Sequence, residues 1–260
     1  MPELPEVETL KRQLIQVISG AKILKISILD EKLGPPINLA GRTIISLSRK
    51  GKELHIGLDD GNTLLLHLRM TGRLLWQEDS ALQLPHTRFS ITFSHGRLDL
   101  IDPRRFATLK VEKEQIGSHT EAMDPLNGFS ACLIGETGRK KKLSIKSFLV
   151  NQRFIAGIGN IYACEILHAA KLSPLRKTCD LSPRERALLA DSATAILSKA
   201  IACRGTTVSD WRDLFGQKGE YQDCLKVYGR EGAPCPRCGA AIERLKLAGR
   251  GTYFCPACQT

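Results

Sequence analysis

The sequence lacks any apolar run near the ~18 residues that a membrane-spanning helix needs. It also lacks the basic start of a signal peptide, because prolines and glutamates occupy that stretch. Internal repeats and low-complexity tracts are absent as well. These absences disfavour membrane, secreted and repeat proteins. We expect a reducing, intracellular location, where the nine cysteines serve as thiols or metal ligands rather than as disulfides.

Acidic residues are too few to balance the basic ones. The 260 residues include 38 Lys and Arg against 27 Asp and Glu, for a net charge of +11. Such an excess points to a polyanionic partner, with nucleic acid favoured over an anionic membrane surface. The hydrophobic content of 42% is that of a globular protein, and the length suits two modest domains or one large one.

The first half of the chain changes from helical to strand periodicity. A helix is expected over residues 5–18, with Pro5 in its first turn and an apolar stripe through Leu10 and Leu14. Apolar residues then alternate with polar ones up to about residue 110. The six strands predicted there span residues 23–29, 43–48, 53–58, 63–68, 88–93 and 97–101. Together they indicate a β-sandwich or barrel.

The second half is predicted to be mainly helical up to about Leu214, after a change of pattern within residues 117–127. Ser182 and Glu185 form a capping-box pattern for a helix that ends near Cys203. Residues 216–219 are typical of a loop. The basic run at residues 139–142 fits either a solvated loop or a phosphate contact.

Cysteine spacing near the C-terminus indicates a structural metal site. Cys235 and Cys238 are separated from Cys255 and Cys258 by sixteen residues, which suits two knuckles holding one zinc ion. Four thiolates leave no open coordination position. Strands over 242–247 and 252–254 would form a hairpin with Arg250 at its tip. The other cysteines are expected to be mostly small core residues; they are Cys132, Cys164, Cys179, Cys203 and Cys224.

The start Met1-Pro2-Glu3 carries a possible nucleophile. Removal of Met1 would leave Pro2 with a free secondary amine, and an α-amino group titrates near ~7.7–8.0. Attack of this amine on a sugar carbon gives an iminium ion, which acts as an electron sink. Glu3 could move the protons. The alternative is that Pro2 merely precedes a helix.

A glycine-rich turn precedes a second helix at Gly157, Gly159 and Asn160. Such a turn presents backbone N–H groups and the positive end of the helix dipole to an anion. Asn160 could cap the helix or bind a phosphate oxygen. A plain corner between two helices remains the alternative.

Three separated motifs resemble the formamidopyrimidine-DNA glycosylase (Fpg) family. They are the start Pro2-Glu3-Leu4-Pro5-Glu6, the turn Gly157-Ile158-Gly159-Asn160-Ile161-Tyr162, and the finger segment Gly249-Arg250-Gly251-Thr252. The resemblance covers essentially the whole chain. Leu4 favours this branch over the endonuclease VIII branch.

The resemblance implies the catalytic roles. Pro2 would attack the sugar C1′ and Glu3 would act as general acid and base. Lys52 matches a strand-borne lysine that contacts phosphate at the lesion, and Arg250 matches the fingertip arginine that grips the flanking phosphates. Asn160 matches a phosphate-binding asparagine. Glu6 and Glu165 match acidic residues near the active site.

Further residues would open the duplex, since the damaged base must leave the stack. The family inserts a Met, an Arg and a Phe, which correspond to Met70, Arg104 and Phe106. An apolar wedge offsets lost stacking, and an arginine can pair with the orphaned base. The alternative is that Met70 and Phe106 are ordinary strand residues. His86 and Lys146 complete the set of expected DNA contacts.

The chain also departs from the family pattern. Asn151 and Cys164 replace residues that are more commonly acidic or serine, and the stretch 210–224 keeps Gly219 and Tyr221 but little else. That stretch corresponds to the loop that reads the damaged base. Base preference is therefore the weakest part of the resemblance.

The expected fold is α+β and multidomain. It comprises a β-sandwich domain with a flanking helix (1–116), a helix-two-turn-helix domain (117–230) and a four-cysteine zinc finger (231–260).

The expected function is a bifunctional glycosylase and lyase that excises oxidised purines and cleaves the strand by β,δ-elimination. Alternatives are an endonuclease VIII-like enzyme for oxidised pyrimidines and a non-catalytic binder of damaged DNA. Double-stranded DNA is the expected partner, one zinc ion the only cofactor, and a bacterial cytoplasmic, nucleoid-associated monomer the expected state.

Overall fold

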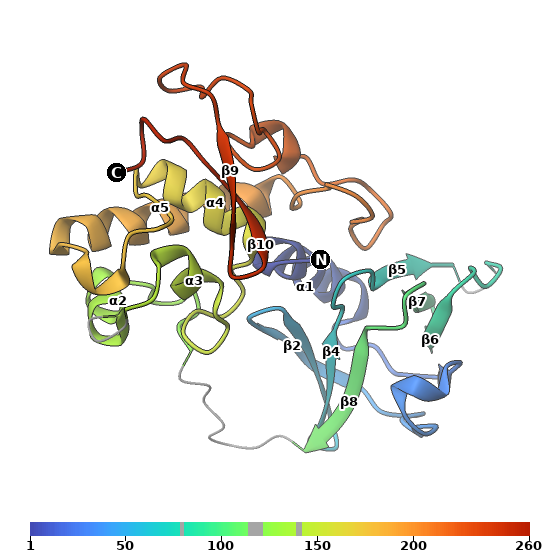
Figure 1. The fold of residues 1–260 in the computed structure, drawn as a ribbon. Coiled ribbons are helices and arrows are strands. Elements are labelled where there is room, and N and C mark those ends of the chain that lie inside the picture. Colours follow the sequence, from blue (N-terminus) through green and yellow to red (C-terminus); the bar gives the residue numbers. More distant parts are fainter. Residues whose placement is uncertain (79–80, 114–121, 139–141) are drawn as a thin grey trace. The chain divides into compact units, whose positions relative to one another are not determined.

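The structure, a computed structural model, describes residues 1–78, 81–113, 122–138 and 142–260 (Figure 1). The chain forms two compact units, and both are discontinuous in sequence. The amino-terminal unit comprises Met1–Ser118 and Cys203–Gln222; the carboxy-terminal unit comprises His119–Ala202 and Asp223–Thr260. The chain thus passes between the units after residues 118, 202 and 222.

Helix α1 (Leu4–Ile18) opens the amino-terminal unit, as predicted. Its first turn carries Pro5, which suits a position where the backbone N–H needs no helical partner. Glu3 and Glu6 form a reciprocal capping box that satisfies two free N–H groups. Leu10 and Leu14 are fully buried, so the apolar stripe of the helix faces the core.

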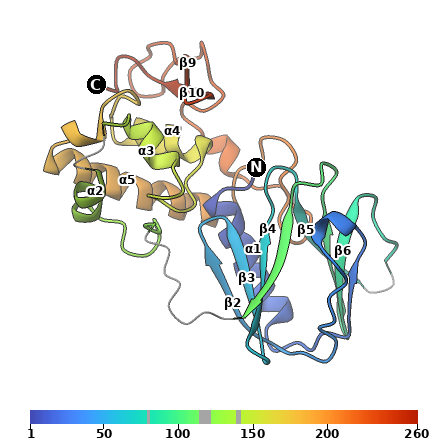
Figure 2. The same ribbon diagram turned by 60° about the horizontal axis from the view of Figure 1, so that its bottom comes forward.

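Two four-stranded antiparallel sheets make up the rest of this unit. One has the order β1-β6-β7-β5 and the other β2-β3-β4-β8 (Figure 2). The strands are β1 (Lys25–Ile28), β2 (Ile44–Lys50), β3 (Glu53–Leu58), β4 (Asn62–His67), β5 (Arg73–Gln77), β6 (Thr87–Phe93), β7 (Gly96–Ile101) and β8 (Thr108–Lys113). A short 3-10 helix spans Glu31–Leu33. The predicted sandwich is confirmed, but β5 and β8 were missed.

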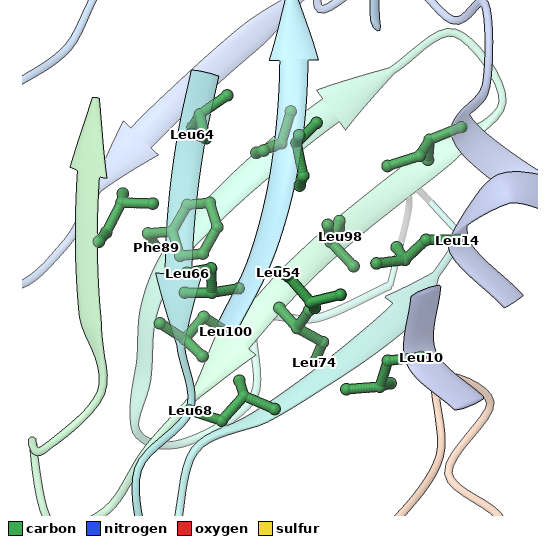
Figure 3. Packing of buried hydrophobic residues seen from close by; sticks show 14 of the residues in the cluster. Leu10, Leu14, Leu54, Leu64, Leu66, Leu68, Leu74, Phe89, Leu98 and Leu100 are labelled. Carbon is green, nitrogen blue, oxygen red and sulfur yellow. The ribbon is translucent and has the colours of Figure 1, made fainter. Parts of the chain in front are cut away.

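The inward faces of the two sheets share one hydrophobic core. Figure 3 shows Leu54, Leu64 and Leu66 of one sheet beside Phe89, Leu98 and Leu100 of the other, with Leu10 and Leu14 of α1 at the edge. Each of these side chains is at most 1% exposed. The amino-terminal helix is thereby held against the sandwich by the hydrophobic effect.

The carboxy-terminal unit is mainly helical and ends in a hairpin. Its helices are α2 (Ala131–Gly138), α3 (Ile145–Val150), α4 (Asn160–Ala169) and α5 (Pro183–Ala202), and its strands are β9 (Glu243–Leu247) and β10 (Arg250–Phe254). A short 3-10 helix spans Thr178–Asp180, and another, Tyr221–Cys224, lies where the chain passes back into this unit. The end of α5 agrees with the prediction. Residues 203–214 were expected to be helical, but they form a loop of the other unit because their polar groups bond to each other and to α1.

Some expectations fall outside the described residues. Residues 139–141 of the basic run are among these, as is the proposed domain boundary between 116 and 117. Within the described ranges, no helix combines the length and apolarity required to cross a membrane.

Leu98 gives a direct test of the sandwich core. Replacing it with Ala should lower the free energy of unfolding by ~2–5 kcal/mol, because the fully buried side chain leaves a cavity. Urea denaturation followed by tryptophan fluorescence measures the change. Leu82, which is 89% exposed, is the control, and its replacement by Ala should cost less than ~0.5 kcal/mol. Equal effects of the two substitutions would contradict the assignment of Leu98 to the core.

Candidate active site and metal centre

The amino-terminal segment is buried and held in place. Pro2 is buried, and Glu3 is 3% exposed at the cap of α1. The Glu3 N–H donates a hydrogen bond of 2.7 Å to Oε2 of Glu6, while the Glu3 carboxylate accepts from the Glu6 N–H. Pro2, which lies directly before this cap, is therefore attached to an ordered backbone rather than to a frayed terminus.

Glu6 also binds the segment that follows α5. Its Oε1 accepts a hydrogen bond of 2.7 Å from the backbone N–H of Thr206. Gly205 adopts a left-handed φ of +82°, and a Cβ at this position would lie 2.7 Å from Oε1 of Glu6. Glycine is thus required both by backbone geometry and by the approach of Glu6. One carboxylate therefore joins the start of the chain to the loop 203–222.

Lys52 lies in the tight turn between β2 and β3 and is 7% exposed. The resemblance implied a lysine on a strand, but β3 begins only at Glu53. Arg49 fixes this turn, since its guanidinium donates to Oε2 of Glu8 at 3.1 Å and to the Gly51 carbonyl at 2.8 Å. Helix α1 and the Lys52 turn are thereby connected through one buried ion pair.

Glu8 is an essential part of this connection that the sequence analysis did not identify. Burial by itself would raise the pKa of Glu8, but Lys11, Arg12 and Arg49 outweigh it and hold the pKa below its usual value. The carboxylate therefore stays ionised at neutral pH. The sequence did offer one signal for a role of Glu8, since it is one of three glutamates near the positive end of the predicted helix.

The loop 203–222 is ordered around Asp213, which is 1% exposed. Its carboxylate accepts from the side-chain amide of Gln13 at 2.9 Å and from the backbone N–H groups of Phe215 and Gln217 at 3.0 and 2.8 Å. The Gln13 side chain in return accepts from the Leu214 N–H. The loop expected to read the damaged base is thus fastened to α1.

Met70 and Phe106 lie in loops, not in strands. Met70 is 49% exposed between β4 and β5, and Phe106 is 41% exposed between β7 and β8. The guanidinium carbon of Arg104 lies 4.7 Å from the centroid of the Phe106 ring. His86 is also exposed and has a left-handed φ of 64°. The alternative in which Met70 and Phe106 are ordinary strand residues is therefore wrong.

In the carboxy-terminal unit, Asn160 and Lys146 connect the helices to the hairpin. The Lys146 ammonium donates to Oδ1 of Asn160 at 2.6 Å and to the Thr252 hydroxyl at 2.7 Å. The Asn160 amide donates to the Gly251 carbonyl at 2.9 Å. Gly159, not Asn160, is the cap of α4. Since Lys146 is 2% exposed, its observed role is to position Asn160, and a direct phosphate contact stays a prediction.

Arg250 is the first, exposed residue of β10 and pairs with Leu247. The turn was expected to span four residues, but it contains only Ala248 and Gly249. Both have left-handed φ values, 49° and 76°, as a two-residue hairpin turn with this twist requires. Arg250 therefore lies beside the hairpin tip on a paired strand.

Glu165 of α4 anchors the segment that leads into the finger. Its carboxylate accepts hydrogen bonds of 2.9–3.0 Å from the backbone N–H groups of Lys226, Val227 and Tyr228. Burial raises the pKa of Glu165 above its usual value despite these bonds. The resemblance left its role open; the structure assigns it a positioning role within this unit.

The four predicted metal ligands come together in the finger. The sulfur atoms of Cys235, Cys238, Cys255 and Cys258 all lie within 4.8 Å of one another. Those of Cys238 and Cys255 are 3.5 Å apart, and those of Cys235 and Cys258 are 3.9 Å apart. A tetrahedral ion with metal–sulfur bonds of ~2.3 Å places its ligands ~3.8 Å apart. The spacing therefore fits one four-coordinate ion.

The surroundings of the cluster also suit a cation. The neighbouring Cys238 thiol is the main cause that raises the pKa of Cys258 to about 12, so closely spaced thiolates need a positive charge between them. His168 Nε2 lies 3.4 Å from the sulfur of Cys235. Such a group outside the ligand set orients a metal ligand.

The remaining cysteines do not match the expectation of mostly core positions. Cys164 is buried, Cys179, Cys203 and Cys224 are half-buried, and Cys132 is exposed. Helical periodicity placed them in helices but could not distinguish the inner face from the outer one.

Family models match almost the whole chain. The formamidopyrimidine-DNA glycosylase N-terminal domain matches residues 1–109, and the H2TH domain of the same enzymes matches residues 122–211. A zinc finger found in FPG and IleRS matches residues 232–260.

Individual relatives agree with these matches. Formamidopyrimidine-DNA glycosylase of Pelotomaculum thermopropionicum is 40% identical, with 100% of this chain and 99% of the other covered. The Desulforamulus reducens protein of that name is 39% identical over the same shares. A crystal structure of a Lactococcus lactis FPG mutant with Fapy-dG-containing DNA has a TM-score of 0.92 at 36% identity, with both chains fully covered. The Lactococcus lactis Fpg complex with DNA containing an abasic site has a TM-score of 0.91 at 36% identity, with 99% of both chains covered.

Removal of one ligand tests the metal centre. Cys255→Ser should abolish stoichiometric metal binding, because the fully buried Cys255 thiolate is one of four ligands. Inductively coupled plasma mass spectrometry of the purified protein measures metal per chain. Cys132→Ser is the matched control, since this exposed cysteine lies outside the cluster, and it should retain one equivalent. Retention of a full equivalent by Cys255→Ser would refute the four-cysteine site.

Proposed function

The chain belongs to the formamidopyrimidine-DNA glycosylase family, and on this basis we propose that it is a bifunctional DNA glycosylase and abasic-site lyase of base excision repair. The observation that carries the proposal is the buried start of the chain, in which Glu3 and Glu6 fix the backbone beside Pro2. A plain DNA-binding protein has no need of an amino terminus held in this way. Preorganisation of the attacking group is, by contrast, what catalysis requires.

The proposed chemistry begins at Pro2. After removal of Met1, its nitrogen attacks C1′ of the flipped nucleotide. The bond from C1′ to the base breaks with its electron pair on the base, which takes up the proton that the nitrogen loses. Glu3 supplies the proton that opens the sugar ring and later accepts one. The resulting iminium ion makes the C2′ proton acidic, and loss of this proton expels the 3′ phosphate by β-elimination. Loss of the C4′ proton from the conjugated iminium ion then expels the 5′ phosphate by δ-elimination.

The other site residues have proposed binding roles. Lys52 and Arg250 contact phosphates next to the lesion, and Asn160 binds a further phosphate. Met70, Arg104 and Phe106 fill the space left by the flipped nucleotide, which is supported by their exposed positions in loops. His86 and Lys146 are the remaining candidates for DNA contact.

Oxidised purines are the proposed substrates, with 8-oxoguanine and formamidopyrimidines foremost. The complex of the Lactococcus relative with Fapy-dG-containing DNA supports this choice. Zinc is the proposed ion of the four-cysteine site, supported by the ligand set and by the matching finger family. Its role is structural, because all four positions are occupied by sulfur. We further propose a monomer in the bacterial cytoplasm, associated with the nucleoid. Its proposed domains along the sequence are 1–116, 117–230 and 231–260, and residues 203–222 of the second pack in the amino-terminal unit.

Borohydride trapping on a duplex with a defined lesion tests the proposed function. We expect a covalent adduct with 8-oxoguanine DNA, and peptide mass spectrometry should place it on Pro2, because reduction fixes the iminium ion. Undamaged duplex is the control. An oxidised-pyrimidine duplex in parallel separates the purine from the pyrimidine preference. An adduct on a lysine, or none with any lesion, would defeat the proposal.

Glu3→Gln tests the general acid. Glutamine keeps an oxygen that can accept the Glu6 N–H bond but cannot transfer a proton. Base excision should therefore fall by ~100-fold or more, while trapping on a preformed abasic site persists because that sugar opens in water. Single-turnover kinetics measures both steps. Glu112→Gln, at a 53% exposed side chain on β8, should leave both rates unchanged. Equal loss in both steps would exclude this role for Glu3.

A further inference from the structure

Asp102, directly after β7, is the hub of two loops and is 1% exposed. Its Oδ1 accepts from the Thr71 hydroxyl at 2.5 Å and from the Arg104 N–H at 3.2 Å. Its Oδ2 accepts from the N–H groups of Phe106 and Ala107, each at 2.7 Å. One buried carboxylate therefore fixes the backbone of residues 104–107 and, through Thr71, the end of the loop between β4 and β5.

The exposed residues of these loops are those proposed to enter the DNA. Met70 precedes Thr71, while Arg104 and Phe106 stack on each other within the 104–107 segment. The Asp102 N–H in addition donates to the His86 carbonyl at 3.0 Å. Four candidate DNA contacts of the amino-terminal unit are thus linked to Asp102: Arg104, Phe106 and His86 are bonded to it, and Met70 precedes Thr71, which is bonded to it.

Hydrogen bonds keep Asp102 charged, and a cationic side chain lies beside it. Arg88 Nη1 lies 3.4 Å from its Oδ2 and also donates to the Ala107 carbonyl at 3.0 Å. Burial would raise the pKa of Asp102, but hydrogen bonds from Ala107 and Thr71 outweigh it and lower the pKa below the usual value. An ionised carboxylate accepts bonds on both oxygens, which a neutral side chain of the same size cannot do.

A second carboxylate, that of Asp30, extends the network to Arg105. Arg88 Nε donates to Asp30 at 2.6 Å, and the same carboxylate binds the guanidinium of Arg105. Arg105 has a left-handed φ of 56°, an unfavourable conformation for a residue with a side chain. The network thus holds a strained loop in one shape.

We propose that Asp102 is a positioning residue. It holds the loop with Met70 and the loop with Arg104 and Phe106, here called the wedge-bearing loops, in the shape needed to enter the base stack. This inference rests on the proposed function, since it assigns the wedge role to Met70, Arg104 and Phe106. Insertion from a loop that must first become ordered would cost conformational entropy in each encounter. Asp102 removes that cost without touching the DNA.

Asp102→Asn is the test, and Asp99→Asn is its matched control. Asp99 lies three residues earlier, is 0% exposed and also bonds an arginine, Arg97, at 2.9 Å. Its partners Gln77 and Arg97 lie on β5 and β7, outside the loops that carry Met70, Arg104 and Phe106. Both variants lose a buried carboxylate charge, so a general loss of stability affects both, whereas only Asp102→Asn disturbs the loops.

Two measurements separate positioning from stability. The first is excision of 8-oxoguanine from duplex DNA, compared with cleavage at an abasic site in a single strand, which needs no insertion. Asp102→Asn should reduce the first rate by ~10–100-fold, as expected for misplacement of positioning groups, and the second by less than ~2-fold. Asp99→Asn should change the two rates equally. Equal loss of both activities in Asp102→Asn, or no loss, would overturn the inference.

The second measurement does not depend on catalysis. Fluorescence of 2-aminopurine placed beside a stable abasic-site analogue rises when insertion unstacks it. Wild type and Asp99→Asn should give the same rise, and Asp102→Asn a smaller one at saturating protein. A full rise with Asp102→Asn would refute the inference even if no chemistry occurs. Absence of a Pro2 adduct in wild type would instead refute only the proposed function.

A milder variant covers the case in which Asp102→Asn does not fold. Thr71→Val removes the hydroxyl that bonds Asp102 and leaves the carboxylate bonds to residues 104–107 intact. Like Asp102→Asn, it should reduce both the rate of excision from duplex DNA and the fluorescence rise. Cleavage of the single strand should stay unchanged. Wild-type behaviour of Thr71→Val in both duplex measurements would contradict a positioning link between the two loops.

Discussion

The burial of α1 against the β-sandwich is the interaction on which the rest of the site depends. Chain ends usually fray unless something holds them. Here Leu10 and Leu14 place the helix in the sandwich core, and the capping box then extends order to Glu3. The proposed nucleophile at the second residue has an ordered backbone because the hydrophobic effect fixes the helix behind it.

Buried carboxylates that accept backbone N–H groups recur through both units. Glu6 binds Thr206, Glu165 binds the three residues from Lys226 to Tyr228, and Asp213 orders its own loop. A loop cannot satisfy its own polar groups as a helix does, so an acceptor from a rigid element does it instead. The acidic residues are a minority of the charges, yet several of the buried ones hold loops in place.

Much of this architecture was predictable from local patterns. The metal site followed from cysteine spacing, and the sandwich followed from alternation of apolar and polar residues, because both signals depend on near neighbours in sequence. Strand β8 was predictable from the alternation of Leu109 and Val111 with polar residues, but β5 has adjacent leucines that obscure the period. The roles of Glu8 and Asp102 were not predictable, since their partners lie up to about forty residues away and are recognised only in the fold.

The interleaving of the two units along the chain has a consequence for synthesis on the ribosome. Residues 203–222 complete the amino-terminal unit but are translated after four helices of the other unit. Until then Glu6 lacks its Thr206 partner and Gln13 lacks Asp213. A chain that terminates early carries the proposed nucleophile without the loop that we expect to read the damaged base. The bonds that hold this loop to α1 therefore form only late in translation, after most of the polypeptide has been made.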